Sequence, residues 1–336
     1  MSGELAACGK VFLAGEYGVL DPGRPALVAG IDRKLHARWE PAAELRLVHG
    51  PTRLVWDGGA APPELRFAAR AAGLARSFCG SARGVRIVFE DDLSLEGRKL
   101  GLGGSAAACV LAVRAVCAAA GRAADDESIL PLALAAHWAE QGGSGSGADV
   151  AAAALGGVLE VRSRIPWRSA EEVMALPAQE IAALRPLQVR RVRTPPDLRL
   201  MLAWTGEPAD TRILVREVRA FSQALPQRWA VRASAIEAAA EALRDALEAA
   251  DADAALDAVR GAAVAMAALG EEARAGIVTA DLALACALAA SVGAAGKPSG
   301  AGGGDCAVIV AFGDEAAGRA EAALRPRFSV FPIAPA

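Results

Sequence analysis

Three glycine-rich segments lie within this 336-residue chain, and each adjoins small or apolar residues. They read KLGLGGSAA at 99–107, GGSGSGAD at 142–149 and KPSGAGGGDC at 297–306. Glycine permits backbone conformations that are closed to other residues, and it lets a ligand approach the main chain closely. Where such a loop opens a helix, the free N–H groups and the helix dipole favour an anion. We therefore expect the loops to form a site for an anionic ligand, with a phosphate as the first candidate.

The composition indicates a folded protein of enzyme size. Hydrophobic residues make up 54% of the chain and charged residues 22%, which excludes global disorder. The formal net charge is −3, so there is no overall basic field that would hold nucleic acid. No apolar stretch reaches the ~20 residues that a bilayer requires, and the N-terminus lacks the features of a signal peptide. A cytoplasmic protein that acts on a small molecule, with no nucleic-acid, membrane or obligate protein partner, is expected.

Lysine is rare in this chain. Lysine and arginine total 36, yet only Lys10, Lys34, Lys99 and Lys297 are lysine. A bias toward arginine should spare lysine where a compact ammonium is needed. Three of the four adjoin glycine-bearing segments, which predicts a role at a phosphate site. The six cysteines form no CxxC pair and are expected to be buried thiols.

The pattern of apolar residues predicts an α+β fold. Both halves mix strands and helices without a regular βαβ alternation. The predicted strands cover 8–14, 26–31, 35–39, 45–48, 53–56, 85–89, 158–161, 198–204, 306–312 and 328–333. The predicted helices cover 65–78, 105–120, 128–141, 211–221, 227–250, 253–269, 273–292 and 315–324. Thr194-Pro195-Pro196 marks a boundary between domains at 1–195 and 196–336.

Taken one at a time, the loops allow other interpretations. The Walker pattern GxxxxGK[ST] is absent, whereas Gly101, Gly103 and Ala106 satisfy the dinucleotide pattern nominally. That interpretation is disfavoured, because the preceding strand ends about ten residues too early. The first loop could also be a plain helix entry, the second a linker or helix cap, and the third a long connection. Lys10, within its predicted strand, could be a surface charge.

In combination the segments carry a resemblance. GKVFLAGEYGVLDPGRPALVAGIDR at 9–33, the loop at 99–107 and the loop at 297–306 resemble the three signature motifs of the GHMP small-molecule kinases, in order and at similar spacing. The resemblance extends over residues 9–312. GSGADVAAAALGG at 145–157 and WTGEPADTR at 204–212 resemble the members of this superfamily whose acceptor is itself a phosphate ester.

The resemblance implies a fold and a reaction. It implies an N-terminal domain like ribosomal protein S5 domain 2, a ferredoxin-like C-terminal domain, and ATP with Mg²⁺ as the phosphoryl donor. The implied reaction turns 5-phosphomevalonate into 5-diphosphomevalonate on the route from mevalonate to isoprenoids. The alternatives are a kinase for mevalonate or another alcohol, a non-catalytic sensor on the same fold and, third, a nicotinamide dehydrogenase.

The resemblance also implies roles for individual residues. Lys10 and Asp149 match the catalytic pair, and Ser105 matches the residue at Mg²⁺. Binding of the ATP phosphates falls to Lys99, Gly101, Leu102, Gly103, Gly104, Ser105 and Ala106. Contact with the acceptor falls to Glu16, Tyr17, Gly145, Ser146, Thr211, Lys297, Ser299, Gly300, Gly302, Gly303 and Asp305.

This chain departs from the family pattern at two positions. Gly104 stands where the family has a serine, and Asp210 stands where the usual Pro-Ala-Ser-Thr has its serine. An aspartate near a phosphorylated acceptor would repel it, so Asp210 bears on the identity of the acceptor. The motifs fix no second acidic ligand for Mg²⁺, and Glu140 is a nearby candidate. The sequence also suggests that Ser105 caps the helix that follows the first loop.

Overall fold

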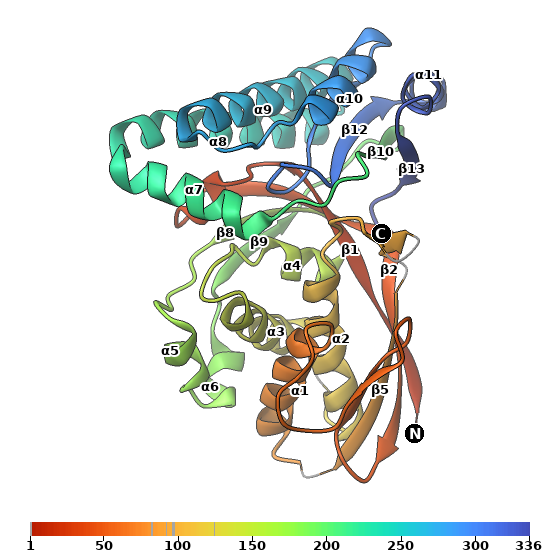
Figure 1. Cartoon of the computed structure of the whole chain (residues 1–336), viewed down its shortest axis with the longest axis vertical. Helices are drawn as coiled ribbons and strands as arrows, with labels where there is room; N and C mark the ends of the chain where they lie inside the picture. The colour runs from red at the N-terminus through yellow and green to blue at the C-terminus, as the bar shows by residue number, and fades with distance from the viewer. Residues whose placement is uncertain (1, 82, 92, 96–97, 124) are drawn as a thin grey trace.

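The computed structural model describes every residue of the chain except 1, 82, 92, 96–97 and 124 (Figure 1). A seven-stranded sheet occupies the first half, in the order β4-β3-β5-β2-β8-β9, with β1 paired to β2. All its pairs are antiparallel except β3 with β5. Its strands are β1 (Gly3–Ala14), β2 (Pro25–Ala42), β3 (Arg46–His49), β4 (Leu54–Trp56), β5 (Gly84–Asp91), β8 (Gly157–Ser163) and β9 (Leu187–Arg191). A small hairpin of β6 (Ser94–Leu95) and β7 (Arg98–Lys99) follows β5 in the chain and precedes the glycine loop at 101–103.

Strand β2 is a single strand of 18 residues, where the sequence predicts two strands around a turn. The register with β1 shifts between Cys8 and Gly9, so that Asp32 and Arg33 form a bulge. A bulge re-aims a strand without ending it. Asp32 exchanges hydrogen bonds with Ala334, which joins the tail of the chain to the bulge. The polar residues that predict a turn therefore serve a bulge inside a continuous strand.

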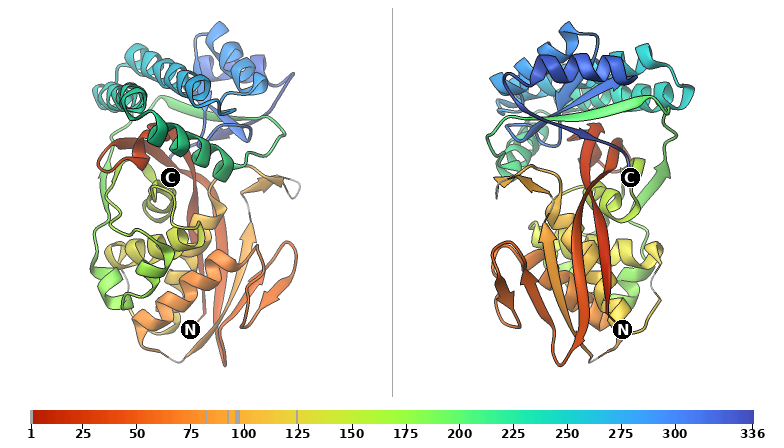
Figure 2. Two further views of the ribbon diagram at one scale, coloured as in Figure 1. Left: turned by 60° about the vertical axis from the view of Figure 1, so that its left-hand side comes forward. Right: turned by 90° about the vertical axis from the view of Figure 1, so that its right-hand side faces the viewer.

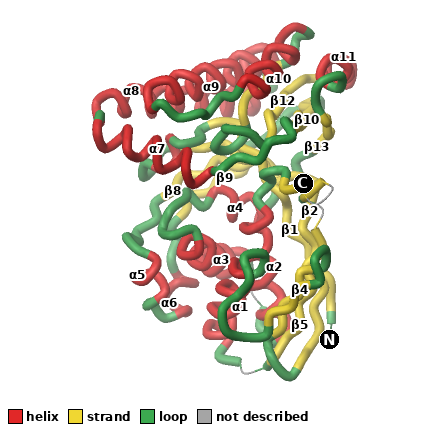
Figure 3. Tube along the Cα trace, viewed as in Figure 1, coloured by secondary structure: helices red, strands yellow, loops and turns green. Residues whose placement is uncertain are grey.

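Helices cover one side of the first sheet (Figure 3). Every side chain of α2 from Cys109 to Val113 is fully buried, because this helix packs against β1, β2, α1, α3 and α4. Its small, apolar sequence suits such a position, since a helix that is apolar all round is a core helix. The helices of this half are α1 (Arg66–Cys79), α2 (Gly104–Ala119), α3 (Asp126–Glu140), α4 (Ala148–Leu155), α5 (Ala170–Met174) and α6 (Ala178–Ala183).

The second half is an antiparallel sheet with helices on it, in the strand order β11-β12-β10-β13. Leu200 and Val308 face the core of the first half, whereas Met201 and Ile309 face α10 and α11. Both faces are buried, which explains why the central strands are apolar throughout. The elements are β10 (Leu198–Trp204), α7 (Thr211–Ala224), α8 (Pro226–Ala249), α9 (Ala252–Ala273), α10 (Ala280–Ser291), β11 (Ala295–Pro298), β12 (Cys306–Phe312), α11 (Asp314–Leu324) and β13 (Ser329–Ile333). Figure 2 shows the long strands of the first half reaching the underside of this sheet.

The predicted helix over 273–292 is wrong in its first turns. Helix α9 ends at Ala273, with Arg274 in the left-handed region at φ 52°, and α10 begins after Thr279, whose hydroxyl caps it. Short elements that the sequence analysis did not predict include β6, β7, α5, α6, β9 and β11. The predicted domain boundary after residue 195 stays a prediction. It is supported by the change of sheet between β9 and β10.

Two expectations drawn from composition can be compared with the structure. Across the described residues, no helix combines the length and apolarity that crossing a membrane would require. The six cysteines are free, and Cys109, Cys117 and Cys306 are buried. The expectation of buried thiols without a disulfide therefore holds for these three.

A buried ion pair joins the two halves. Lys297 of β11 donates to Glu16, which lies in the loop after β1, and to the carbonyl of Pro298. The Lys297 side chain is fully buried, and Glu16 is 3% exposed. A buried charge is costly when its partner is lost, because no water replaces it. The pair therefore fixes the loop after β1 against the second sheet.

Replacing Lys297 with methionine should lower the free energy of unfolding by about 3–5 kcal/mol, because Glu16 would be left as an unpaired buried charge. The double variant Glu16→Leu/Lys297→Met should recover most of that loss, since neither charge remains. Urea unfolding followed by tryptophan fluorescence measures both values. A loss below about 1 kcal/mol in the single variant would contradict this account of the pair.

Candidate active site

The glycine loop at 101–103 leads into α2 and packs closely against the side chains of Lys10 and Asp305. Gly101 has φ 73° and Gly103 has φ 82°, in the region that favours glycine. A Cβ on Gly103 would lie 2.7 Å from Cγ of Lys10, and a Cβ on Gly101 would lie 2.5 Å from Oδ2 of Asp305. Both positions therefore need glycine for space as well as for conformation.

Helix α2 begins without a side-chain cap. Gly103 is its N-cap residue, and no side chain accepts a hydrogen bond there. The suggestion that Ser105 caps the helix is wrong, because Ser105 lies inside the first turn. The first N–H groups of a helix have no partner within the helix. The start of α2 thus offers backbone donors, together with the Ser105 hydroxyl, to an anion.

Lys10 contacts the glycine loop at 101–103 and lies close to Gly300 of the third glycine loop. Its backbone N–H donates to the carbonyl of Leu102 at 2.8 Å, and its Nζ donates to the carbonyl of Gly101 at 2.8 Å. From the other side, a Cβ on Gly300 would lie 3.8 Å from Nζ. Among the described strands β1 pairs with β2 alone, yet both the main chain and the ammonium of Lys10 bind the glycine loop, so Lys10 is not a solvated surface charge.

The charge of Lys10 is balanced by its surroundings. Burial lowers the pKa of the Lys10 ammonium, and the carboxylates of Asp149, Asp305 and Glu16 oppose that shift. Burial also raises the pKa of Asp305, and the Lys10 charge acts in the opposite sense. A compact cation thus lies among three carboxylates beside a loop that is suited to phosphate.

Asp149 lies in the first turn of α4, directly after the second glycine segment. Its Oδ1 accepts from the N–H of Val150 at 2.9 Å, and its side chain is 21% exposed. Its Oδ2 lies 3.7 Å from Nε2 of His137. The apolar helix that follows rules out a flexible linker, so the carboxylate is held on a rigid element.

His137 is a member of the site that the sequence analysis missed. It belongs to α3, is 1% exposed, and its Nε2 lies 3.1 Å from Oγ of Ser105. Burial lowers the pKa of His137; Asp149 opposes this shift and Lys10 adds to it. The available signal was a lone histidine in the apolar stretch ILPLALAAHWAE, in a chain with three histidines.

The third glycine loop is tied to the loop after β1. Oγ of Ser299 accepts from the N–H of Phe12 at 3.2 Å, and the Tyr17 hydroxyl donates to the carbonyl of Ala301 at 2.5 Å. Tyr17 is buried, and burial raises its pKa. These contacts are internal to the protein, as is the Lys297–Glu16 pair.

Several residues expected to contact the acceptor therefore face other parts of the protein. Lys297, Glu16, Tyr17 and Ser299 connect the first and third loops, and Ser146 accepts from the N–H of Ala148. Those nearest Lys10 are Asp149, Gly300 and Asp305, whereas Thr211 is the exposed first residue of α7. Lys99 ends β7, and its side chain lies outside the described part of the structure.

Asp210 has a structural role, because its carboxylate caps the first turn of α7. It is the N-cap residue of α7, and its Oδ1 accepts from the N–H groups of Arg212 and Ile213. Serine and aspartate are both favourable N-cap residues. The departure from Pro-Ala-Ser-Thr therefore preserves the cap, and the loop before α7 packs on Gly304 and Asp305.

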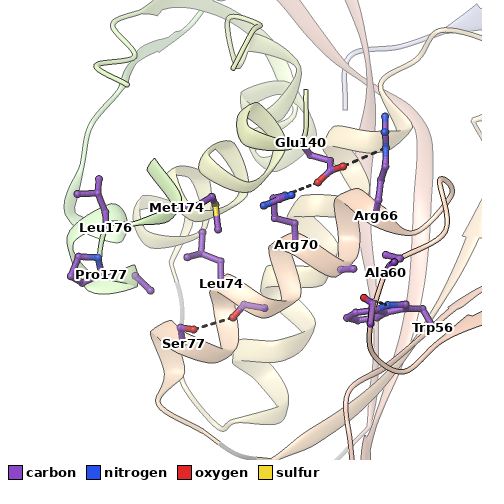
Figure 4. Close-up of a pocket in the computed structure, with 15 residues that line it drawn as sticks. Trp56, Ala60, Arg66, Arg70, Leu74, Ser77, Glu140, Met174, Leu176 and Pro177 are labelled. Atoms are coloured by element: carbon purple, nitrogen blue, oxygen red, sulfur yellow. Dashed lines mark hydrogen bonds and ion pairs between the residues drawn. The ribbon is translucent and has the colours of Figure 1, made fainter. Parts of the chain in front are cut away.

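A cavity of about 740 Å³ lies between β4, α1, the end of α3 and residues 174–178 (Figure 4). Glu140 projects into it and pairs with Arg70 at 2.6 Å and with Arg66 at 3.6 Å. Both carboxylate oxygens are thus occupied by arginine. This pairing argues against Glu140 as the second ligand of Mg²⁺.

Comparison with known proteins agrees with this arrangement. The family model described as GHMP kinases N terminal domain matches residues 66–157, which include the glycine loop, His137 and Asp149. A relative named phosphomevalonate kinase, from Streptomyces sp. (strain CL190), is 32% identical over 344 residues, covering 90% of this chain and 88% of the relative. The chain therefore belongs to the GHMP kinases. Among them, it belongs to the phosphomevalonate kinase family.

Solved structures confirm the fold. Streptococcus pneumoniae phosphomevalonate kinase in complex with phosphomevalonate and AMPPNP superposes with a TM-score of 0.89 at 21% identity, over 99% of this chain and 100% of that one. L. major mevalonate kinase in complex with R-mevalonate superposes with a TM-score of 0.73 at 20% identity, over 98% and 95%. The α+β class and the GHMP kinase fold expected from the motifs are confirmed. Proteins named for two different acceptors share this fold, so the fold does not choose between those acceptors.

Replacing Asp210 with serine should leave the free energy of unfolding nearly unchanged, because serine caps a helix as well as aspartate does. Replacing it with alanine should cost about 1 kcal/mol, since two N–H groups lose their acceptor. Urea unfolding measures both, and Asp251→Ala, at the N-cap of α9, is a matched control that should lose a similar amount. A gain in stability for Asp210→Ala would mean that repulsion, rather than capping, governs this position.

Proposed function

We propose that this chain transfers the terminal phosphoryl group of ATP to the phosphate of 5-phosphomevalonate, which gives ADP and 5-diphosphomevalonate. The observation that carries the proposal is the placement of Lys10 against the loop at 101–103 and beside Gly300. Phosphoryl transfer depends on positioning and charge neutralisation more than on covalent chemistry. A compact cation between two glycine loops meets that demand.

The nucleotide belongs at the start of α2. The N–H groups of its first turn, the Ser105 hydroxyl and the Lys10 ammonium converge where a triphosphate would lie. The cavity lined by Trp56 and Arg66 is a candidate for the nucleoside end, because it lies along α1, which packs against α2. Gly104 lacks the hydroxyl of the family's serine, so Ser105 alone offers a side-chain oxygen at that turn.

The donor atoms of the site fit Mg²⁺ that arrives with the nucleotide. The described residues contain no cluster of three or more metal-binding side chains. Mg²⁺ usually keeps several waters and takes one or two carboxylates together with substrate phosphates. Ser105 and Asp149 would hold it, and the ion would neutralise charge on the phosphates.

Lys10 and Asp149 have complementary tasks in the transfer. The Lys10 ammonium neutralises charge that is shared between the donor and acceptor oxygens. A phosphate monoester has its second pKa near 6, so the attacking oxygen is already largely ionised at pH 7 and needs no strong base. Asp149 then orients Lys10 and the acceptor. With an alcohol acceptor, the same carboxylate would be the general base.

The alternative is a kinase for mevalonate or another alcohol, because the loops could serve either acceptor. What favours the phosphorylated acceptor is the relative from Streptomyces sp. (strain CL190), together with the cap role of Asp210. That role accounts for the aspartate at this position without a contact to the acceptor.

Phosphomevalonate should be turned over with a kcat/KM at least roughly a hundred-fold above that of mevalonate, since a site built for a polar group rejects an analogue that lacks it. ADP release from ATP with each acceptor measures this ratio. Equal or better turnover of mevalonate would replace the proposed acceptor while leaving the fold assignment intact.

Asp149→Asn and Lys10→Met should each lower kcat by about a hundred-fold or more, with little change in the affinity for ATP, because the backbone at α2 binds the nucleotide. The double variant should be little worse than the worse single variant, as residues that act as a unit are non-additive. Lys10→Arg should not restore activity, because a guanidinium is wider than an ammonium and cannot replace a compact point charge.

Lys34→Met is the matched control for Lys10, since Lys34 is also half-buried but lies on β2 away from the loops. It should retain the kcat of the unmodified enzyme. Asp149 lies inside the first turn of α4, whose N-cap residue is Gly147, so the helix-cap alternative does not apply to it. An active Asp149→Asn enzyme would show that the negative charge of this side chain is not needed for the transfer. A fully active Lys10→Arg enzyme would likewise refute the point-charge role.

A further inference from the structure

His137 contacts both sides of the proposed reaction centre, and the mechanism above does not use it. Its Nε2 lies 3.1 Å from Oγ of Ser105 and 3.7 Å from Oδ2 of Asp149. Ser105 belongs to the nucleotide side, at the start of α2, and Asp149 to the acceptor side, at the start of α4. A single ring nitrogen therefore faces two residues that reach the site from different helices.

The ring is held firmly in place. His137 is 1% exposed, lies among buried residues in the last turn of α3, and contacts the ring of Phe67 at 5.1 Å between ring centroids. Few rotamers remain for a ring packed in this way. Because the ring is fixed by α3 and α1, its Nε2 can hold the side chains of Ser105 and Asp149 in fixed positions.

The Asp149 carboxylate beside Nε2 favours the tautomer that carries its proton on that nitrogen. A bare Nε2 would direct its lone pair toward the Asp149 carboxylate, which repels it. A protonated Nε2 is attracted to the same carboxylate and can donate to Oγ of Ser105. Ser105 then accepts, so its own hydroxyl proton stays free for an acceptor outside the protein.

We propose that His137 is a positioning residue for phosphoryl transfer. Its Nε2–H donates to Ser105 and faces Asp149, so that the Ser105 proton is directed at a phosphate oxygen and the two sides of the centre keep a fixed separation. This inference rests on the proposed kinase function and adds a residue to it. The same side chain would serve a kinase with either acceptor, because Ser105 and Asp149 are common to both.

Kinetics of three variants test the donor role. His137→Phe keeps the ring shape and removes the N–H, and it should lower kcat about 10–100-fold, as is typical when an outer partner of a site is lost. His137→Gln keeps an N–H near the position of Nε2 and should recover most of that loss. His137→Phe in the Ser105→Ala background should add little, because His137 acts through the hydroxyl that Ser105→Ala has already removed.

His36→Gln is the control, since His36 is exposed on β2 and away from the site; its kcat should equal that of the unmodified enzyme. Equal losses for His137→Gln and His137→Phe would overturn the donor role and leave only a packing role. Unchanged kcat in His137→Phe would overturn the proposal altogether. If the unmodified enzyme shows no turnover of ATP with either acceptor, it is the proposed function that fails.

A measurement without substitution or substrate completes the test, and it decides the matter even if His137→Phe does not fold. The chain has only three histidines. Nitrogen NMR of ¹⁵N-histidine-labelled protein, with His36→Gln and His49→Gln for assignment, reports which ring nitrogen of His137 carries the proton. A proton on Nε2 supports the proposal. A proton on Nδ1 alone overturns it.

Discussion

The buried pair of Lys297 and Glu16 is the interaction on which the arrangement of the site depends. It joins the strand before the third glycine loop to the loop after β1, in a place where neither charge can be solvated. The contacts of Ser299 with Phe12 and of Tyr17 with Ala301 lie within a few residues of it. The first and third motifs thus form one body. Lys10 takes its position from that body and from the glycine loop before α2.

The parts of the site that the sequence predicts are those that depend on local chain geometry. The sequence alone shows the glycine segments that need positive φ, and it shows the few lysines that remain in an arginine-rich chain. The lysine criterion selected both Lys10 and Lys297, but it could not tell a lysine at the proposed phosphate site from one in a buried ion pair. That difference depends on which residues of the other half lie opposite, and Glu16 is 281 positions away.

The parts that the sequence could not provide arise from packing between distant segments. In the sequence, His137 is a single polar residue within an apolar helix. Only the packing of α3 against α2 places its ring beside Ser105. The polar residues Asp32 and Arg33 resemble a turn, and only the tail at Ala334 shows that they belong to a bulge. Asp210 resembled a charge facing an anion until the start of α7 fixed it as a cap. In each case the local sequence is compatible with two structures, and a contact with a distant or neighbouring segment determines which one forms.

The interruption between α9 and α10 bears on the balance between stability and activity. A helix running unbroken through Ile277 would use its carbonyl internally and would gain regular hydrogen bonds. In the break, that carbonyl instead accepts from the N–H of Gly303 at 2.8 Å, and Gly302 passes so close that a Cβ would lie 2.1 Å from it. Substitutions that improve the local helix propensity of 274–279 would therefore strengthen the helical layer and release the third glycine loop. A search for thermostable variants guided by propensity alone would select against the site at this point.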